Sequence, residues 1–466
     1  MIDAYLSQHR EAFEQDMFKL LAIPSVSTDN RRSSDVRRCA EEVARQMREA
    51  GLEEVQLRDT PGHPVVYGHW VKAPGKPTVL VYGHYDVQPE DPVDLWTSPP
   101  FQPTVRDGKV YARGATDDKG QFLTHIKAVQ ALLATRQELP VNIKFLIEGE
   151  EEVGSPNLAP FLRENRGLLA ADLLVVSDSA MFAPGIPSIV YGLRGLAYVQ
   201  VDLKGADSDL HSGIFGGAVP NPGFELCRLI AQLKDERGRV TVPGFYDKVR
   251  NLEPEERAEY ANLPFDEEEF RASLGVPGLH GEEGYTCLER KSARPTLEIN
   301  GMLCGYTGEG AKTVLPNKAM AKISCRLVPD QDPEEIAELL ARHIRDLLPA
   351  TVEANIRSLH GGKPWITPRS HPALKAAARA LEREFGRHPV FVREGGSIPI
   401  VVDFEQILGL PGILLGFGLN DENLHAPNEH FDLGNYHRGI RTVTYLLEEL
   451  AGEPGRLEAT SIESTV

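Results

Sequence analysis

Histidines and carboxylates stand directly after apolar segments of this sequence. His84 and Asp86 follow the apolar residues 78–82. In an extended chain, residues two apart face the same side, so both side chains can point at one locus. A neutral imidazole binds a metal ion through one nitrogen while a nearby carboxylate accepts the hydrogen of the other. The pair fits such a ligand with its orienting group, and it also fits a hydrogen-bonded histidine at a strand end.

Four further motifs have a similar placement. They are the string RGATDDKG at 113–120, the string EGEEEVGS at 148–155, Asp178 after residues 173–176, and His425 after residues 412–417. Taken alone, the acidic pair of the first string fits a helix cap, and acid runs are usually solvated surface. Open α/β sheets, however, bind ligands at the carboxyl ends of their strands.

Two histidines with three or more carboxylates at strand ends make the ligand set of a two-metal hydrolytic centre. Like charges packed together are costly unless protons or cations neutralise them. Mixed nitrogen and oxygen ligation suits Zn²⁺ first, and Mn²⁺ and Co²⁺ are compatible with it.

The secondary-structure pattern around these motifs predicts an α/β sheet covered on both faces by helices. Short, largely apolar strands alternate with helices, which is the pattern of buried, mainly parallel sheets. We expect strands at 64–70, 78–82, 141–147, 173–176, 390–392 and 412–417, and helices at 35–50, 121–133, 372–385 and 435–450.

A different pattern separates the two parts of this sheet. A strand, a helix, two strands, a helix and a strand are expected at 196–203, 224–233, 296–302, 319–327, 333–347 and 351–358, with an irregular, acid-rich stretch at 251–283. This order is that of the ferredoxin-like split βαβ arrangement. We therefore expect a catalytic domain formed by 1–192 and 364–466, with a second domain, 193–363, inserted into it.

Composition narrows the class of protein. The 466 residues include 50 Lys and Arg against 68 Asp and Glu, a formal net charge of −18. A negative overall field disfavours nucleic acid and anionic membranes as partners. The five cysteines are odd in number and form no C-x-x-C pair, which favours a reducing compartment. Neither a signal peptide nor a membrane span is evident, so we expect a soluble cytoplasmic protein.

Five motifs, in order, resemble one known family. The strings GHYDVQP (83–89), RGATDDKG, EGEEEVGS, SDLHSG (208–213) and NLHAPNE (423–429) resemble those of the M20 metallopeptidases, in the cytosolic dipeptidase (carnosinase-like) branch. The resemblance implies a zinc-peptidase-type α/β catalytic domain with an inserted ferredoxin-like α+β lid and dimerisation domain. It also implies a dinuclear-metal hydrolase that cleaves dipeptides with free amino and carboxyl ends.

Carried over position by position, the resemblance implies a role for each motif residue. One metal ion would be held by His84, Asp117 and Asp178, and the other by Asp117, Glu152 and His425, with Asp117 bridging. Glu151 would be the general base that takes a proton from the attacking water and returns it to the leaving amine. Asp86 would orient His84. The family places the base and the ligand immediately before a segment like 153–155, which leaves Glu150 as a spare carboxylate.

The inserted domain would supply groups for the substrate. In similar enzymes the histidine at His211 comes from the partner subunit of a homodimer and stabilises the tetrahedral oxyanion, a contribution of about 3–4 kcal/mol. Arg326 resembles the lid arginine that grips the substrate carboxylate, a bidentate task that suits a guanidinium. Thr313, Gly396 and Ser397 resemble further substrate contacts.

The sequence is also compatible with other reactions. An N-acyl-amino-acid amidohydrolase, a desuccinylase or a carboxypeptidase would use the same centre. Asp178, where carboxypeptidase- and acylase-type members have Glu, and the long stretch 251–283 favour a dipeptidase. An inactive scaffold would have lost a ligand or the base, and none is lost. A serine hydrolase is excluded because no G-x-S-x-G elbow is paired with a histidine, and an NAD enzyme is excluded because no G-x-G-x-x-G follows the first strand.

Overall fold

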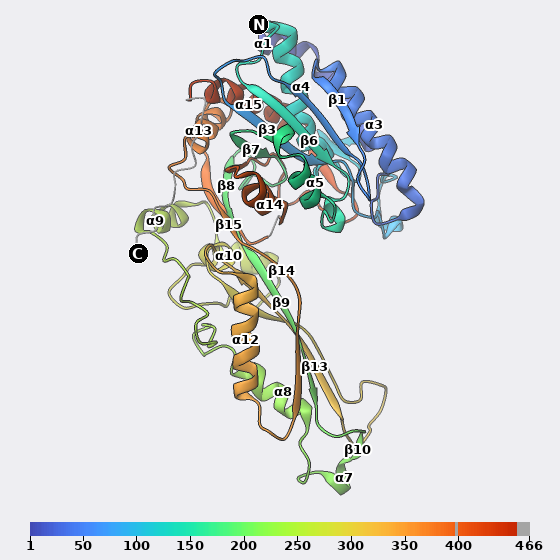
Figure 1. Cartoon of the computed structure of the whole chain (residues 1–466), viewed down its shortest axis with the longest axis vertical. Coiled ribbons are helices and arrows are strands. Elements are labelled where there is room, and N and C mark those ends of the chain that lie inside the picture. The colour runs from blue at the N-terminus through green and yellow to red at the C-terminus, as the bar shows by residue number, and fades with distance from the viewer. Residues whose placement is uncertain (397–398, 454–466) are drawn as a thin grey trace. The chain divides into compact units, whose positions relative to one another are not determined.

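The computed structural model describes residues 1–396 and 399–453, and the chain forms two compact units (Figure 1). The first unit contains residues 1–191, 367–391 and 400–453. The second contains residues 192–366 and the short segment that begins at 392. Among the described residues, no helix combines the length and the apolar character that crossing a membrane requires.

The first unit is built on a large mixed sheet with the strand order β1-β2-β6-β3-β7-β17-β8. Strands β3, β6, β7 and β17 run parallel to their neighbours in this group, so their carboxyl ends lie at one edge. The strands are β1 (Glu53–Arg58), β2 (Val65–Trp70), β3 (Thr78–His84), β6 (Asn142–Glu148), β7 (Leu173–Val176), β8 (Ser188–Leu193) and β17 (Gly412–Leu414). Strands β15 (Trp365–Ile366) and β16 (Val390–Glu394) also pair with β8.

Helices cover both faces of this sheet, as the sequence predicts. Side chains of a strand alternate between its faces. On β3, a Cβ added to Gly83 would lie 2.5 Å from Cβ of Phe122 on α4 (Lys119–Arg136), so glycine permits the close approach of that helix. The preceding residue, Tyr82, packs edge-on against Phe404 of α14 (Pro399–Leu408), with ring centroids 5.4 Å apart. Helices α4 and α14 therefore lie on opposite faces.

The remaining elements of the first unit surround this sheet (Figure 1). They are α1 (Ile2–Gln8), α2 (Arg10–Leu21), α3 (Ser33–Glu49), α5 (Leu158–Glu164), α6 (Arg166–Leu169), α13 (Pro372–Phe385), α15 (Leu433–Leu450) and a small sheet of β4 (Thr104–Arg106), β5 (Lys109–Tyr111) and β18 (His430–Asp432). Three short 3-10 turns are η1 (Asn30–Arg32), η2 (Val93–Leu95) and η3 (Glu151–Val153).

The second unit contains a four-stranded antiparallel sheet with the order β11-β13-β9-β14. These strands are β9 (Gly195–Lys204), β11 (Thr296–Cys304), β13 (Lys318–Leu327) and β14 (Glu353–Gly362). Helices α8 (Pro222–Ala231) and α12 (Pro333–Leu347) pack on it. Alternate residues of β13, from Ala319 to Leu327, are buried in the core of this unit. The chain order of the strands across the sheet is that of the expected ferredoxin-like arrangement.

The acid-rich stretch 251–283 is more regular than expected. It contains α9 (Pro254–Asn262) and α10 (Glu267–Ser273). Asp266 caps α10 by accepting hydrogen bonds from the N–H groups of Glu268 and Glu269. Both helices are short and rich in glutamate, so they lack the apolar periodicity that predicts a helix. The other elements of this unit are β10 (Leu210–His211), α7 (Ser212–Phe215), α11 (Cys287–Ser292) and β12 (Val314–Leu315).

Candidate metal centre

Adjacent parallel strands bring several of the predicted site residues to one edge of the large sheet. His84 is the last residue of β3, and β6 ends at Glu148, just before the turn that carries Glu151 and Glu152. Asp178 stands two residues after the end of β7. Since these strands are neighbours and run parallel, their carboxyl ends deliver all of these side chains to the same place.

Two loops supply the remaining side chains. Asp117 precedes α4, in a loop that leaves β5, and a cis peptide bond joins it to Asp118. His425 lies in the long loop between β17 and β18, where its backbone adopts a left-handed conformation with φ of 59°.

Five of these side chains form two groups that share one carboxylate. His84, Asp117 and Asp178 form the first group, and Asp117, Glu152 and His425 form the second. Within each group, one potential ligand atom from each residue lies within 4.8 Å of the others. Oδ1 of Asp117 is 3.0 Å from Nε2 of His84, whereas its Oδ2 is 2.8 Å from Nε2 of His425. The two oxygens of Asp117 thus face different histidines, which is the arrangement a bridging carboxylate requires.

Asp86 connects the end of β3 to the turn that follows β6. Its carboxylate accepts hydrogen bonds from the N–H groups of Glu151 and Glu152, each at 3.2 Å. Nδ1 of His84 is 3.1 Å from the carbonyl oxygen of Asp86 and 3.4 Å from its Oδ1. Both are acceptors, so Nδ1 carries a hydrogen, and Nε2, which faces Asp117, is the nitrogen that would bind a metal ion after losing its own proton.

The electrostatics of the cluster call for a cation. Burial and the charge of Asp117 raise the pKa of Glu152 to about 8 and that of Asp178 to about 6. Burial opposes the ionisation of Asp117 as well, but the two histidines outweigh it and hold the pKa of Asp117 well below its ordinary range. The carboxylates thus repel one another enough to retain protons, which a divalent cation between them would replace.

The buried nitrogen of His84 supports the same conclusion. His84 is fully buried, and its Nε2 makes no hydrogen bond of acceptable geometry to any described residue, although Asp117 and Asp178 lie nearby. Buried polar atoms are normally satisfied. An imidazole nitrogen aimed at two carboxylates fits a metal ligand, so the residues present suit two divalent cations.

The neighbouring acids point elsewhere. The carboxylate of Asp118 accepts a hydrogen bond from the backbone N–H of His84 at 3.2 Å and belongs to neither group. Glu150 accepts two hydrogen bonds from the side chain of Asn157. Sequence reasoning gave no role to Gln88, whose Nε2 donates to Oε2 of Glu152 at 2.7 Å. Its place inside the string GHYDVQP was the available signal.

The described residues among the predicted substrate groups lie in the second unit. His211 in β10 pairs in register with Val314 of β12, and the N–H of Ser212 donates to the carbonyl of Thr313, so His211 and Thr313 are neighbours. Arg326 lies on the half-exposed face of β13, opposite the buried face. Gly396 is exposed, and Ser397 lies outside the described residues.

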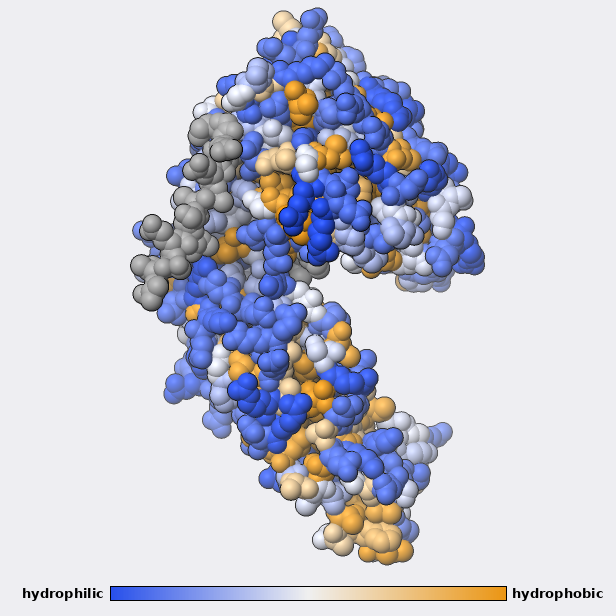
Figure 2. All heavy atoms as spheres, viewed as in Figure 1, coloured by the Kyte–Doolittle hydropathy of each residue, from blue (hydrophilic) through white to orange (hydrophobic). Residues whose placement is uncertain are grey.

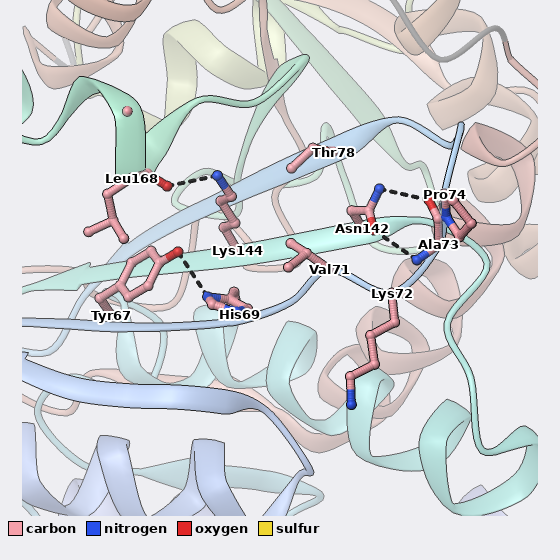
Figure 3. Close-up of a pocket in the computed structure, with 11 residues that line it drawn as sticks. Tyr67, His69, Val71, Lys72, Ala73, Pro74, Thr78, Asn142, Lys144 and Leu168 are labelled. Atoms are coloured by element: carbon pink, nitrogen blue, oxygen red, sulfur yellow. Dashed lines mark hydrogen bonds between the residues drawn. The ribbon is translucent and has the colours of Figure 1, made fainter.

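A separate surface pocket of about 490 Å³ lies at the other ends of the same strands (Figure 3). Thr78 and Asn142, the first residues of β3 and β6, line it. Its polar groups are engaged within the protein: Nζ of Lys144 donates to the carbonyls of Leu168 and Ala170, each at 2.7 Å. The pocket is not lined by any of the predicted site residues.

Sequence comparison reveals full-length relatives. The chain is 33% identical over 461 residues to the Cys-Gly metallodipeptidase dug1 of Schizosaccharomyces pombe, covering 96% of this chain and 97% of that one. It is 35% identical over 444 residues to the Beta-Ala-His dipeptidase of Homo sapiens, covering 94% of this chain and 86% of the relative.

A comparison with solved structures also finds metallopeptidases. The M20 family metallo-carboxypeptidase Sso-CP2 of Sulfolobus solfataricus superimposes with a TM-score of 0.82 at 34% identity, covering 94% of this chain and 99% of that structure. Residues 80–449, which include all of the side chains of both ligand groups, match the profile of peptidase family M20/M25/M40. The chain therefore belongs to peptidase family M20/M25/M40.

Proposed function

We propose that this protein is a dinuclear-metal dipeptidase that hydrolyses the peptide bond of dipeptides with a free amino and a free carboxyl end. The shared carboxylate of Asp117, with one oxygen toward each histidine, is the observation that carries the proposal. When bound, two divalent cations would polarise the scissile carbonyl and lower the pKa of water. Zn²⁺ is the first choice for the mixed nitrogen and oxygen ligands, with Mn²⁺ and Co²⁺ as alternatives.

Glu151 is proposed as the general base. Its backbone is fixed by the hydrogen bond to Asp86, and burial with the charges of Asp178 and Glu152 raises the pKa of its carboxyl to about 8 against the opposing effect of His84. Bound cations would lower that value, leaving a carboxylate able to accept a proton near neutral pH. Glu151 takes the proton of the attacking water and delivers it to the leaving amine.

The second unit is proposed to recognise the substrate. The guanidinium of Arg326 would pair with the C-terminal carboxylate, a bidentate task that suits arginine. Thr313, Gly396 and Ser397 would provide further polar contacts. The N–H of Gly213 donates to Nδ1 of His211 at 3.0 Å, so the ring hydrogen of the neutral imidazole sits on Nε2. Nε2 is then a donor for the developing oxyanion.

We further propose a homodimer in which His211 acts in the site of the partner subunit. Exposed apolar side chains gather on the second unit, over α7, the start of α8 and the end of β11 (Figure 2). They include Ile214, Phe224 and Leu303, which are 70%, 70% and 57% exposed. Clustered exposed apolar side chains are typical of protein–protein contacts. The five free cysteines support a reducing, cytoplasmic setting for this assembly.

The proposed activity predicts a clear substrate pattern. Metal-depleted protein, restored separately with Zn²⁺, Mn²⁺ or Co²⁺, would be assayed on dipeptides, on the same dipeptides N-acetylated or N-succinylated, and on a tripeptide. We expect hydrolysis of the free dipeptides only, and none without metal. Preference for the acylated compounds would indicate an amidohydrolase, and removal of the last residue of the tripeptide would indicate a carboxypeptidase.

Substitution of two adjacent glutamates separates the base from the spare carboxylate. Glu151→Gln should lower kcat by about 10²–10⁴-fold, because an amide cannot accept the proton, while both metal ions stay bound. Glu150→Gln is the matched control, since that side chain faces Asn157, and its kcat should stay within a few-fold of wild type. Steady-state kinetics and metal analysis check both. A loss of kcat that is larger for Glu150→Gln than for Glu151→Gln would refute the assignment of Glu151 as the base.

Mixed dimers test whether His211 acts in trans. His211→Ala homodimers should lose about 10²–10³-fold in kcat, as for removal of one oxyanion donor. A heterodimer of one His211→Ala subunit and one Glu151→Gln subunit contains one complete site, so it should regain about half of the wild-type activity. Purified, differently tagged heterodimers provide the measurement. Heterodimers as inactive as either parent would show that His211 serves its own subunit.

A further inference from the structure

A fully buried carboxylate close to the centre has no part in the chemistry above. Glu429 ends the loop that carries His425 and has no exposed surface. We propose that Glu429 is a positioning residue that holds Asp117 between the two ligand groups. This inference rests on the proposed function, because it assigns Glu429 to the placement of the bridging carboxylate.

Four hydrogen bonds connect Glu429 to the loop that leads to Asp117. Oε2 accepts from Nη1 of Arg113 at 2.8 Å and from the N–H of Gly114 at 2.9 Å. Oε1 accepts from the N–H groups of Thr116 and Asp117, at 3.1 and 3.2 Å. One carboxylate thus binds both the side chain that opens the loop and the backbone of the bridging residue itself.

These contacts provide hydrogen-bond acceptors for backbone N–H groups of the loop, as helices and strands do for their own backbone. Gly114, Thr116 and Asp117 belong to no helix or strand, so their N–H groups have no ladder partner and need another acceptor. Glu429 is that acceptor for all three. Arg113, itself 1% exposed, supplies the positive charge that a buried carboxylate needs. Removing one partner of such a buried pair leaves the other uncompensated.

A second buried acid joins the same two loops. Oε2 of Glu422 is 2.8 Å from the hydroxyl of Thr116 and accepts from the N–H of Leu419 at 2.9 Å. Glu422 and Glu429 lie on either side of His425 in the sequence. The loop of His425 is therefore fastened at two points to the loop of Asp117. Both ties lie close in sequence to His425 and Asp117, whose side chains approach to 2.8 Å.

The test compares Glu429→Gln with Glu282→Gln. In the first variant an N–H₂ group replaces one oxygen and faces backbone or arginine donors, so at least one pair of contacts is lost. Glu282 is a matched control in the second unit: it is 8% exposed and accepts from both Nε and Nη2 of Arg294 at 2.8 Å. The readouts are Zn²⁺ and Mn²⁺ affinity, by competition with a chelator, and the thermal unfolding of the metal-free proteins.

We expect Glu429→Gln to weaken the binding of at least one ion by about 10–100-fold, the usual effect of removing a group that orients a ligand. Glu282→Gln should lower the unfolding temperature without changing either affinity. If Glu429→Gln binds both ions of the centre with wild-type affinity, for Zn²⁺ and for Mn²⁺, the inference is overturned, whatever the unfolding temperature of the variant. If Glu429→Gln does not fold, Glu429→Asp keeps the charge beside Arg113 but withdraws its oxygens from the backbone. It should show the same loss of affinity, and wild-type affinity would overturn the inference.

The outcome for the wild-type protein separates this inference from the proposed function. Wild-type protein that binds fewer than two ions would contradict the proposed function, and the inference would fall with it. Wild-type protein that binds two ions, together with a Glu429→Gln variant that binds both equally well, would contradict the inference alone.

Discussion

Repulsion among buried carboxylates is the constraint on which the first unit depends. Asp117, Glu152 and Asp178 converge at one edge of the sheet, where burial raises the pKa of Glu152 and of Asp178. Such a cluster does not persist by packing alone, because like charges in a medium of low dielectric constant repel strongly. It is held by the parallel strands beneath it, by the hydrogen bonds of Asp86, and by the ties between the two loops. Cations would supply the compensating charge.

The two units differ in what they contribute. The first contains all of the residues of both ligand groups together with Glu151, so its chemistry is assembled within one compact body. The second provides a ferredoxin-like sheet that presents Arg326 on one face while the other face forms its core. In the proposed function, reaction chemistry and recognition of the substrate ends thus belong to different folding units, which allows substrate preference to change without altering the metal ligands.

Much of this organisation could be predicted from the sequence because it depends on strong local patterns. The apolar strands before His84 and Asp178 were recognisable, and the structure has strands there. The β17 strand, expected to extend to residue 417, ends at Leu414, since the following residues enter the loop toward His425. Helices α9 and α10 were missed because their polar sequences carry no periodic apolar face. The hydrogen bond between the N–H of Asp117 and Glu429 joins residues 312 positions apart in the sequence. No local sequence pattern predicts a contact between residues so far apart.

In the proposed site, Asp117 bridges two metal ions. The most direct measurement is anomalous X-ray diffraction from crystals of the Zn²⁺-loaded protein, recorded on both sides of the zinc absorption edge. Two anomalous peaks are expected, one among His84, Asp117 and Asp178 and one among Asp117, Glu152 and His425, with the carboxylate of Asp117 between them. A single peak, or a pair of peaks not shared by Asp117, would contradict this bridging role.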